Sequence, residues 1–287
     1  MECNNCGRQD FEHFIDASCY FTKVPLVSVK CRNCNLVFLN PRPDKKLGLE
    51  YFEKAYSNAK GFEEHSYYRD HEKIFERNNS RFALIKDLPV TNKSILDFGA
   101  GQGHFVKVAL DNGWAANGIE LSAAAIKAAR ENFNVELFDS LEKLEGKEFG
   151  VIALWDVIEH LEDPRGILLA LSRHLHPKGF FVVETSNIDS VDFLMKKQNW
   201  NYWHVDHLYY YSRQTIQDLF TRLNFKMVSV PGKSGTNAIK RKTIREYIRL
   251  LNPAVMQYAL RRKLIMSKNK DKNISGNSLM TVVATRV

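Results

Sequence analysis

A regular alternation of short apolar strands and helical stretches, beginning at residue 94, constrains the fold of this chain more than any other feature. Apolar runs typical of strands cover 94–98, 115–120, 135–138, 151–155, 179–185, 226–231 and 279–285. Helical patterns lie between them at 105–112, 123–132, 164–174 and 212–223. Strands that alternate with helices indicate a parallel sheet with helices on both faces. The sequence therefore predicts an α/β fold around a mostly parallel, seven-stranded sheet.

Four of the five cysteines form two close pairs near the N-terminus. The pairs are Cys3-x2-Cys6 and Cys31-x2-Cys34, with 24 residues between them. Two tight turns of this kind supply four thiolates for tetrahedral zinc, and the segment resembles a zinc ribbon. Because all four ligands would be protein groups, we expect the zinc to be structural. The alternative is four reduced surface cysteines.

Composition and charge limit the classes of function. Hydrophobic residues make up 44% and charged residues 26%, as in ordinary globular proteins, and the N-terminus lacks the pattern of a secretory signal, so we expect a cytoplasmic protein. Residues 1–232 carry 28 Lys and Arg against 31 Asp and Glu, whereas 233–287 carry 13 against 2. This uneven distribution argues against nucleic acid as the partner, because RNA-binding proteins spread basic residues over the face that meets phosphate.

A glycine-rich turn follows the first strand of the predicted sheet. Asp97, Gly99, Gly101 and Gly103 alternate with other residues, and His104 stands where a dinucleotide-binding fingerprint requires glycine. The pattern resembles motif I of class I S-adenosylmethionine-dependent methyltransferases, whose fold is Rossmann-like. S-adenosylmethionine carries an ammonium and a sulfonium group that an acidic residue favours, and glycines leave room for its methionyl part.

Further matches to the same family follow at the next strand ends. Glu120 lies where a carboxylate accepts hydrogen bonds from the two ribose hydroxyls. The resemblance implies that Asp139 accepts the adenine amino group, although a solvated turn aspartate is the alternative. It also places Trp155 and Asp156, in motif IV, beside the adenine and the methyl-transfer centre. Together these residues are the predicted cofactor site.

The segment 200–212 combines histidines with many aromatic residues after the fifth predicted strand. Histidine can take a proton from a hydroxyl as it attacks the methyl group, and aromatic faces suit a sugar ring. We expect His207 to be the catalytic base, with His160 as its rival and His204 as a further catalytic candidate. The alternative for His207 is hydrogen bonding that only holds the loop.

These patterns predict three regions: a zinc ribbon at 1–40, a helical extension at 41–90, and a methyltransferase domain at 91–287. The expected activity is O-methylation of a sugar, glycan or glycolipid precursor. Zinc ribbons also precede the methyltransferase domain of sugar C-methyltransferases, but those enzymes usually continue into a further C-terminal domain, which favours O-methylation here. The alternatives are an RNA methyltransferase and a non-catalytic binding module with the same fold.

The insertion at 232–277 is helical in pattern and strongly basic. One interpretation is a cap over the substrate cleft with solvated charges. The other is that residues 240–266 bind an anionic membrane surface at the inner face and bring the active site to a lipid-linked acceptor.

Overall fold

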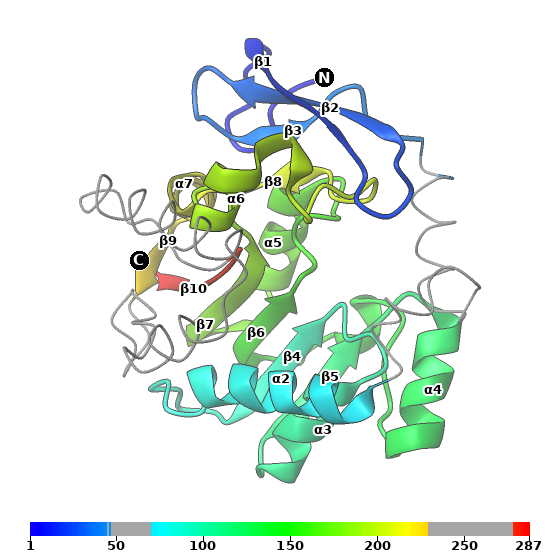
Figure 1. Ribbon diagram of the computed structural model, residues 1–287. Helices are drawn as coiled ribbons and strands as arrows, with labels where there is room; N and C mark the ends of the chain where they lie inside the picture. The colour runs from blue at the N-terminus through cyan, green and yellow to red at the C-terminus, as the bar shows by residue number, and fades with distance from the viewer. Residues whose placement is uncertain (45, 47–69, 229–277) are drawn as a thin grey trace, which may run out of the picture.

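The computed structural model describes residues 1–44, 46, 70–228 and 278–287, and within them it contains two β-sheets (Figure 1). The larger sheet has six strands in the order β5-β4-β6-β7-β10-β9. The smaller, N-terminal sheet has four strands in the order β1-β2-β3-β8. The segment with His204 and His207 connects the two sheets along the chain: it follows β7 of the larger sheet and leads directly into β8 of the smaller sheet.

The larger sheet confirms the predicted α/β fold. Its strands are β4 (Ser94–Phe98), β5 (Ala115–Ile119), β6 (Phe149–Trp155), β7 (Leu175–Ser186), β9 (Phe225–Val228) and β10 (Leu279–Arg286). β4 pairs in parallel with β5 and β6, and β6 pairs in parallel with β7. Only β10 runs antiparallel to its neighbours β7 and β9. The sheet is therefore mostly parallel, as the alternation of strands and helices predicted.

The prediction of seven strands is wrong by one for the described residues. The expected strand at 135–138 makes a single parallel bridge, between Ile119 and Phe138. The amide of Val135 donates instead to the carbonyl oxygen of Ala129, and Asn134 ends helix α4 in the left-handed region. The backbone at the start of this segment thus completes a helix end, so little of it remains to pair with β5.

Helices cover both faces of the larger sheet. The described helices are α2 (His71–Ile85), α3 (His104–Asp111), α4 (Ala123–Phe133), α5 (Pro164–Ser172), α6 (Val191–Lys196) and α7 (Arg213–Arg222), with short 3-10 helices η1 (Glu142–Leu144) and η2 (Lys197–Asn199). Of these, α6 and η2 pack against the N-terminal sheet instead. Successive residues of β4 point to opposite faces, as in any strand. Ile95 packs in the core under α2 and α3, and Leu96 packs in the core under α5 and α7. These two cores fix the carboxyl ends of the parallel strands.

The N-terminal sheet is built on the same body. Its strands are β1 (Phe11–Ser18), β2 (Pro25–Cys31), β3 (Val37–Leu39) and β8 (Tyr209–Tyr210), all antiparallel to their neighbours. Its core contains Val37 and Leu39 together with Trp200, Trp203 and Tyr210, each at most 1% exposed. Three aromatic residues of the segment 200–212 therefore belong to the core of the N-terminal sheet: Trp200, Trp203 and Tyr210.

Parts of two predictions lie outside the described residues. Of the expected helical extension at 41–90 the structure describes α2 and the residues around it, and the basic insertion at 232–277 lies wholly outside the described ranges. Among the helices that are described, none is both long and apolar enough to cross a membrane.

Candidate active site

The glycine turn connects β4 to α3. Gly99 and Gly103 have φ angles of 80° and 77°, and Gly103 is the N-cap of α3. A Cβ atom at Gly99 would lie 2.5 Å from Cγ2 of Val157, the residue after Asp156. The turn therefore requires glycine here both for its backbone conformation and for its close contact with the segment after β6.

Asp97 and Glu120 lie next to this turn and are both buried. Asp97 is 2% exposed, and its Oδ1 has no hydrogen-bond partner among the described residues. Burial raises the pKa of Asp97 to about 7; the charge of Arg81 opposes this shift and that of Glu120 adds to it. The Glu120 carboxylate accepts hydrogen bonds from the amides of Gly101 and Ser122, each at 2.8 Å.

The geometry fits a cationic, hydroxyl-bearing ligand. Two buried carboxylates face a turn that has no side chains at its glycines, and one carboxylate oxygen of Asp97 lacks a partner within the part of the chain described. Each oxygen of Glu120 holds one backbone amide, and a carboxylate oxygen can accept two hydrogen bonds, so capacity for two ribose hydroxyls remains. Asp97 belongs to β4, directly before the glycine turn, and Glu120 directly follows β5.

The other predicted cofactor residues differ in their surroundings. Asp139 follows the bridge residue Phe138, but its side chain is 53% exposed and pairs with Lys143 at 2.8 Å. Trp155 is 6% exposed and packs against Phe105, with ring centroids 5.1 Å apart. The structure therefore places Asp139 in a solvated position beside β5 and Trp155 in the core.

Asp156 takes part in a charge network that the sequence did not indicate. Arg77 and Arg81 of α2 both approach its Oδ2 at 2.5 Å, and both also approach Oε1 of Glu184 on β7, at 3.1 and 2.7 Å. The guanidinium of Arg81 also lies 5.0 Å from the ring centroid of Trp155. α2 thereby neutralises two acidic groups where β6 and β7 end.

The three predicted histidines come together in one cluster with Asp206. The rings of His160 and His207 lie 4.7 Å apart, and those of His204 and His207 lie 4.4 Å apart. Nδ1 of His160 lies 3.0 Å from the carbonyl oxygen of Asp206 and 3.3 Å from its Oδ2. Burial disfavours charge on His160, but Asp206 outweighs it and raises the pKa of His160 to about 9. Burial lowers the pKa of His207 well below its ordinary value.

Aromatic groups connect this cluster to motif IV. Tyr202 lies nearly parallel to the ring of His204, with centroids 6.3 Å apart. Burial raises the pKa of Tyr202 to about 12, and the charge of Asp156 contributes to the shift. Glu159, 1% exposed, accepts a hydrogen bond from Thr185 at 2.8 Å. The histidine cluster therefore lies beside the strand ends that carry the predicted cofactor residues.

Backbone hydrogen bonds hold residues 200–208, here called the histidine loop, between the two sheets. The amides of Leu208 and Tyr209 donate to the carbonyl oxygen of Glu159, at 2.8 and 3.2 Å. The carbonyl oxygen of Leu208 accepts from the amide of Leu39 at 3.0 Å and from Nη1 of Arg42 at 2.8 Å. The guanidinium of Arg42 also lies 4.3 Å from the ring centroid of Tyr209. The position of the histidines thus depends on the N-terminal sheet.

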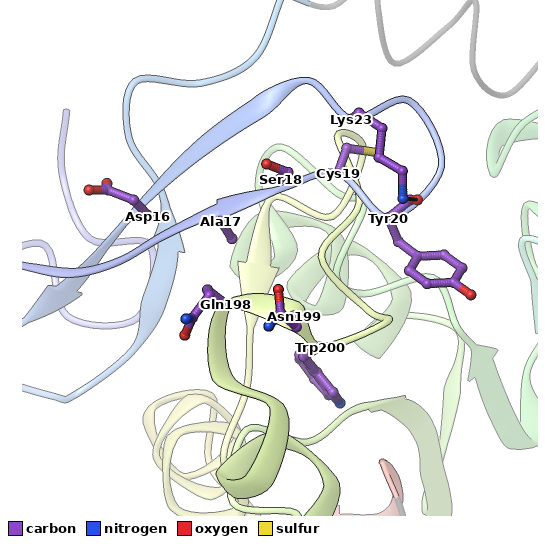
Figure 2. Close-up of a pocket in the computed structure, with 9 residues that line it drawn as sticks. All are labelled: Asp16, Ala17, Ser18, Cys19, Tyr20, Lys23, Gln198, Asn199 and Trp200. Atoms are coloured by element: carbon purple, nitrogen blue, oxygen red, sulfur yellow. Dashed lines mark hydrogen bonds between the residues drawn. The ribbon is translucent and has the colours of Figure 1, made fainter.

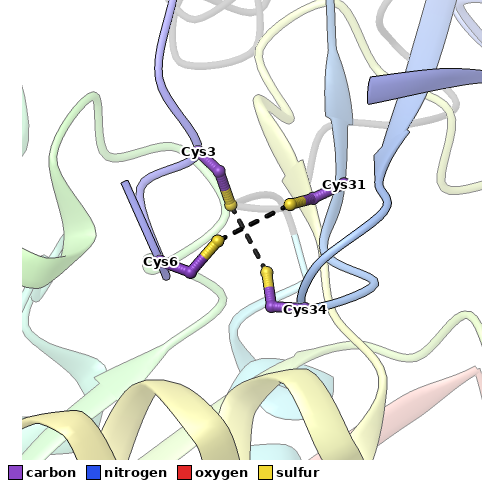
Figure 3. A group of neighbouring side chains, drawn as sticks. All are labelled: Cys3, Cys6, Cys31 and Cys34. Atoms are coloured by element: carbon purple, nitrogen blue, oxygen red, sulfur yellow. Dashed lines mark hydrogen bonds between the residues drawn. The ribbon is translucent and has the colours of Figure 1, made fainter. Parts of the chain in front are cut away.

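The four paired cysteines form a compact cluster (Figure 3). The sulfur atoms of Cys3 and Cys34 lie 3.4 Å apart, and those of Cys6 and Cys31 lie 3.6 Å apart. All four sulfurs are within 4.8 Å of one another. Around a tetrahedral ion with bonds of about 2.3 Å, sulfurs lie about 3.8 Å apart, whereas a disulfide needs about 2.05 Å. The arrangement fits a metal centre better than disulfides.

A surface hollow of about 550 Å³ lies between the turn after β1 and η2 (Figure 2). Its lining includes the polar side chains of Asp16, Lys23, Gln198 and Asn199. The indole of Trp200 forms part of the wall, and the same residue begins the aromatic segment that leads to the histidines. No local sequence pattern predicts this hollow, because its two sides are about 180 residues apart in the chain.

Comparison with known sequences identifies the family. Residues 67–230, more than half of the chain, match the family model for a methyltransferase domain. Ubiquinone biosynthesis O-methyltransferases of Thiobacillus denitrificans and Rickettsia bellii are 28% identical over 116 residues and 29% identical over 129 residues. The alignments cover 37% and 42% of this chain and 50% and 52% of the relatives. The chain thus spans about half the length of the curated relatives it matches.

Solved structures show the same fold. The plantazolicin methyltransferase BamL, in complex with a triazolic desmethylPZN analog and SAH, has a TM-score of 0.53 at 15% identity, covering 82% of this chain and 93% of that one. The plantazolicin methyltransferase BpumL, in complex with SAH, has a TM-score of 0.50 at 18% identity, covering 85% and 97%. With the family match over residues 67–230, one conclusion follows: the chain belongs to the methyltransferase-domain family, and its domain has the fold of these methyltransferases.

Proposed function

We propose that this methyltransferase acts on an oxygen atom of a hydroxylated acceptor, with a sugar, glycan or glycolipid precursor as the first candidate. The observation that carries the proposal is the pairing of His160 with Asp206 beside motif IV. Bound S-adenosylmethionine supplies an electrophilic methyl group. The residues of this chain then have to bind the acceptor, orient its hydroxyl and accept the proton that the hydroxyl loses.

The cofactor residues of the proposal are those predicted from the sequence. Asp97 offers its unpartnered oxygen to the positive charges of the cofactor, and Glu120 offers its remaining lone pairs to the ribose hydroxyls. Gly99, Gly101 and Gly103 give the turn its backbone conformation, with φ angles of 80°, 52° and 77°. Asp139, Trp155 and Asp156 retain their predicted roles in the proposal.

The geometry favours His160 over His207 as the base. The His160 side chain is 33% exposed, and because its Nδ1 faces Asp206, its Nε2 can accept a proton once the ring is neutral, which a pKa of about 9 places at alkaline pH. Pairing of this kind fixes the tautomer and orients the ring. His207 is 5% exposed, so a substrate hydroxyl has little access to it. His204 and His207 instead pack behind His160.

Two features support a sugar as the acceptor. The segment leading to the histidines offers the aromatic face of Tyr202, which is suited to the apolar face of a sugar ring. The hollow beside Trp200 offers amide and charged groups that suit further hydroxyls of a larger glycan. A phenolic ring is the second candidate acceptor, because the curated relatives carry the name of ubiquinone biosynthesis O-methyltransferases.

We also propose that Cys3, Cys6, Cys31 and Cys34 hold one structural zinc ion. The donor set is four thiols, the usual set of a closed structural site, and their spacing is close to that expected around zinc. Mass spectrometry of the native chain should find this zinc. Cys31→Ser should lower both zinc content and thermal stability, and a zinc-free native preparation of unchanged stability would remove the assignment.

The experiment for the activity is a transfer assay with labelled methyl groups. The purified chain is offered nucleotide sugars, lipid-linked glycans, catechols and structured RNA, with a His160→Ala variant as the control for enzymatic transfer. Label in a product that is stable to base, as a methyl ether is and a methyl ester is not, supports O-methylation of a hydroxyl. Transfer to RNA alone, or label on carbon, would contradict the proposal.

A further inference from the structure

The histidine loop contains buried acceptor atoms that hydrogen bonding does not satisfy. Nδ1 of His207 and Oδ1 of Asp206 are both buried, and neither has a hydrogen-bond partner within residues 1–44, 46, 70–228 and 278–287. His207 as a whole is 5% exposed. A buried polar atom without a partner costs about 1–3 kcal/mol, so two in neighbouring residues indicate a missing ligand.

The protonation of the two histidines on this loop is set by backbone carbonyls. Nε2 of His204 donates to the carbonyl oxygen of Asn201 at 2.8 Å, because a carbonyl can only accept. Nδ1 of His207 has no partner in the described part of the chain, and the backbone of Tyr202 favours a proton on this ring, which places the proton of the neutral ring on Nε2. In their neutral forms both rings then carry a lone pair on Nδ1. Histidines that bind metals are typically fixed in this way through the other nitrogen.

Donor atoms of His204, Asp206 and His207 lie close enough to share one ion. One donor atom of each residue lies within 4.8 Å of the others. Around a tetrahedral ion with bonds of about 2.1 Å, donors lie about 3.4 Å apart, so side-chain shifts of roughly an ångström close the site. The second oxygen of Asp206, Oδ2, faces His160 at 3.3 Å and would orient the carboxylate from outside the site.

We propose that His204, Asp206 and His207 form a binding site for a divalent transition-metal ion, separate from the cysteine cluster. Unpaired lone pairs on donor atoms this close together repel one another, and a bound cation relieves this repulsion. Two imidazoles and one carboxylate are a donor set suited to Zn²⁺, Co²⁺ or Fe²⁺, and three protein ligands leave coordination positions open. Because His207 is 5% exposed, the ion would hold the histidine loop in place rather than meet the acceptor, and its binding does not depend on the proposed function.

The test is metal titration of the full chain, without cofactor or acceptor. The metal-free protein receives one equivalent of Zn²⁺ for the cysteine cluster and is then titrated with Co²⁺. We expect a second bound metal per chain, with a visible spectrum that lacks thiolate charge-transfer bands. X-ray absorption at the cobalt edge should show nitrogen and oxygen neighbours. Saturation at one metal per chain, or cobalt with sulfur neighbours only, would overturn the proposal.

Two variants locate the site. Asp206→Asn and His207→Gln should weaken Co²⁺ binding by about 10- to 100-fold or more, the range found when support for a metal site is lost. His13→Gln, a change at an exposed histidine of β1, is the matched control and should bind Co²⁺ normally. Far-ultraviolet circular dichroism and binding of S-adenosylhomocysteine show whether each variant is folded. If a variant unfolds, the absorption spectrum of the unmodified chain still decides the question.

A shared proton is the competing explanation for the two unsatisfied atoms. In that case Asp206 and His207 would share a hydrogen atom after a small shift, and the chain would bind no second metal. Cobalt binding that is unchanged in Asp206→Asn and His207→Gln, but lost in Glu159→Gln, would move the ion to another set of ligands and would also overturn the proposal as stated.

Discussion

Arg42 provides a direct test of the dependence of the histidine loop on the N-terminal sheet. Its guanidinium donates to the carbonyl oxygen of Leu208 at 2.8 Å and lies 4.3 Å from the ring of Tyr209. A hydrogen bond from a charged donor contributes about 1.5–3 kcal/mol, and a partly buried cation–π contact about 0.5–1 kcal/mol. Arg42→Ala should therefore destabilise the contact between the N-terminal sheet and the histidine loop by about 2–4 kcal/mol.

This loss should appear in stability and in methyl transfer, but not in cofactor binding. A change of 2–4 kcal/mol corresponds to a fall in Tm of roughly 5–15 °C for a chain of this size. We expect kcat to fall by about tenfold or more, because small displacements of catalytic groups are costly. Affinity for S-adenosylhomocysteine should stay unchanged, because Asp97 and Glu120 are held by the larger sheet.

The matched control is Arg32→Ala. Arg32 belongs to the same N-terminal unit, but its ion pairs are with Asp10 and Glu12 at 3.4 Å, and its side chain is 55% exposed. Exposed pairs of this kind contribute about 0–1 kcal/mol, so Tm should fall by less than about 4 °C and kcat should not change. Calorimetry, a transfer assay and titration with S-adenosylhomocysteine measure the three quantities. If Arg42→Ala kept full kcat, or lost cofactor affinity as strongly as kcat, the reasoning would be refuted.

Four further predictions concern the cofactor, the base and the insertion. Glu120→Ala should weaken cofactor binding by about 1–3 kcal/mol, measured by calorimetry, and unchanged affinity would remove Glu120 from the site. Burial raises the pKa of Asp97 to about 7, so the contribution of Asp97 to the stability of the fold falls as pH rises from about 4 to 7. Over the same window Asp97 becomes charged, so affinity for S-adenosylhomocysteine should rise by at most about tenfold per pH unit. Asp97→Asn should remove that pH dependence. His160→Ala should bind cofactor yet lose about 100-fold in transfer, with partial rescue by added imidazole, whereas full activity in His160→Ala and none in His207→Ala would return the role of base to His207. Flotation with anionic liposomes tests the basic insertion: binding that is weakened by salt and lost on deleting 240–266 supports a membrane surface, and no binding at low salt leaves the cap.

Local signals in the sequence were sufficient to predict most of the larger sheet. Strand β4 and helix α3 match their predicted positions within one residue, because an apolar run, a glycine turn and an amphipathic stretch each act over a few neighbouring residues. The glycine turn also located Asp97 and Glu120, since both lie next to it in the chain or at the next strand end. The expected strand at 135–138 does not form, and the reason is also local: the amide of Val135 donates to the carbonyl oxygen of Ala129 at the end of α4.

Contacts between distant segments could not be predicted in this way. Strand β8 has only two residues and pairs with β3, which lies about 170 residues earlier in the chain. Tyr209 and Tyr210 gave a clear aromatic signal, but that signal suits a substrate loop as well as a strand. The contact between His160 and Asp206 likewise depends on a loop that passes close to the end of β6. The spacing of apolar and polar residues along the sequence does not predict where such a loop will lie.

The arginines of α2 explain which of the acidic groups remain available for a positively charged ligand. Four carboxylates lie at or near the ends of neighbouring parallel strands: Asp97, Glu120, Asp156 and Glu184. Arg77 and Arg81 bind the last two, on β6 and β7. A buried carboxylate without a cation is costly, and these two have theirs from the protein itself. Glu120 accepts hydrogen bonds from two backbone amides, and Oδ1 of Asp97 has no partner in the described part of the chain. The remaining negative charge is therefore concentrated at β4 and β5, beside the glycine turn. The same covering helix therefore stabilises the acidic groups of β6 and β7 and leaves those at β4 and β5 available for a positively charged ligand.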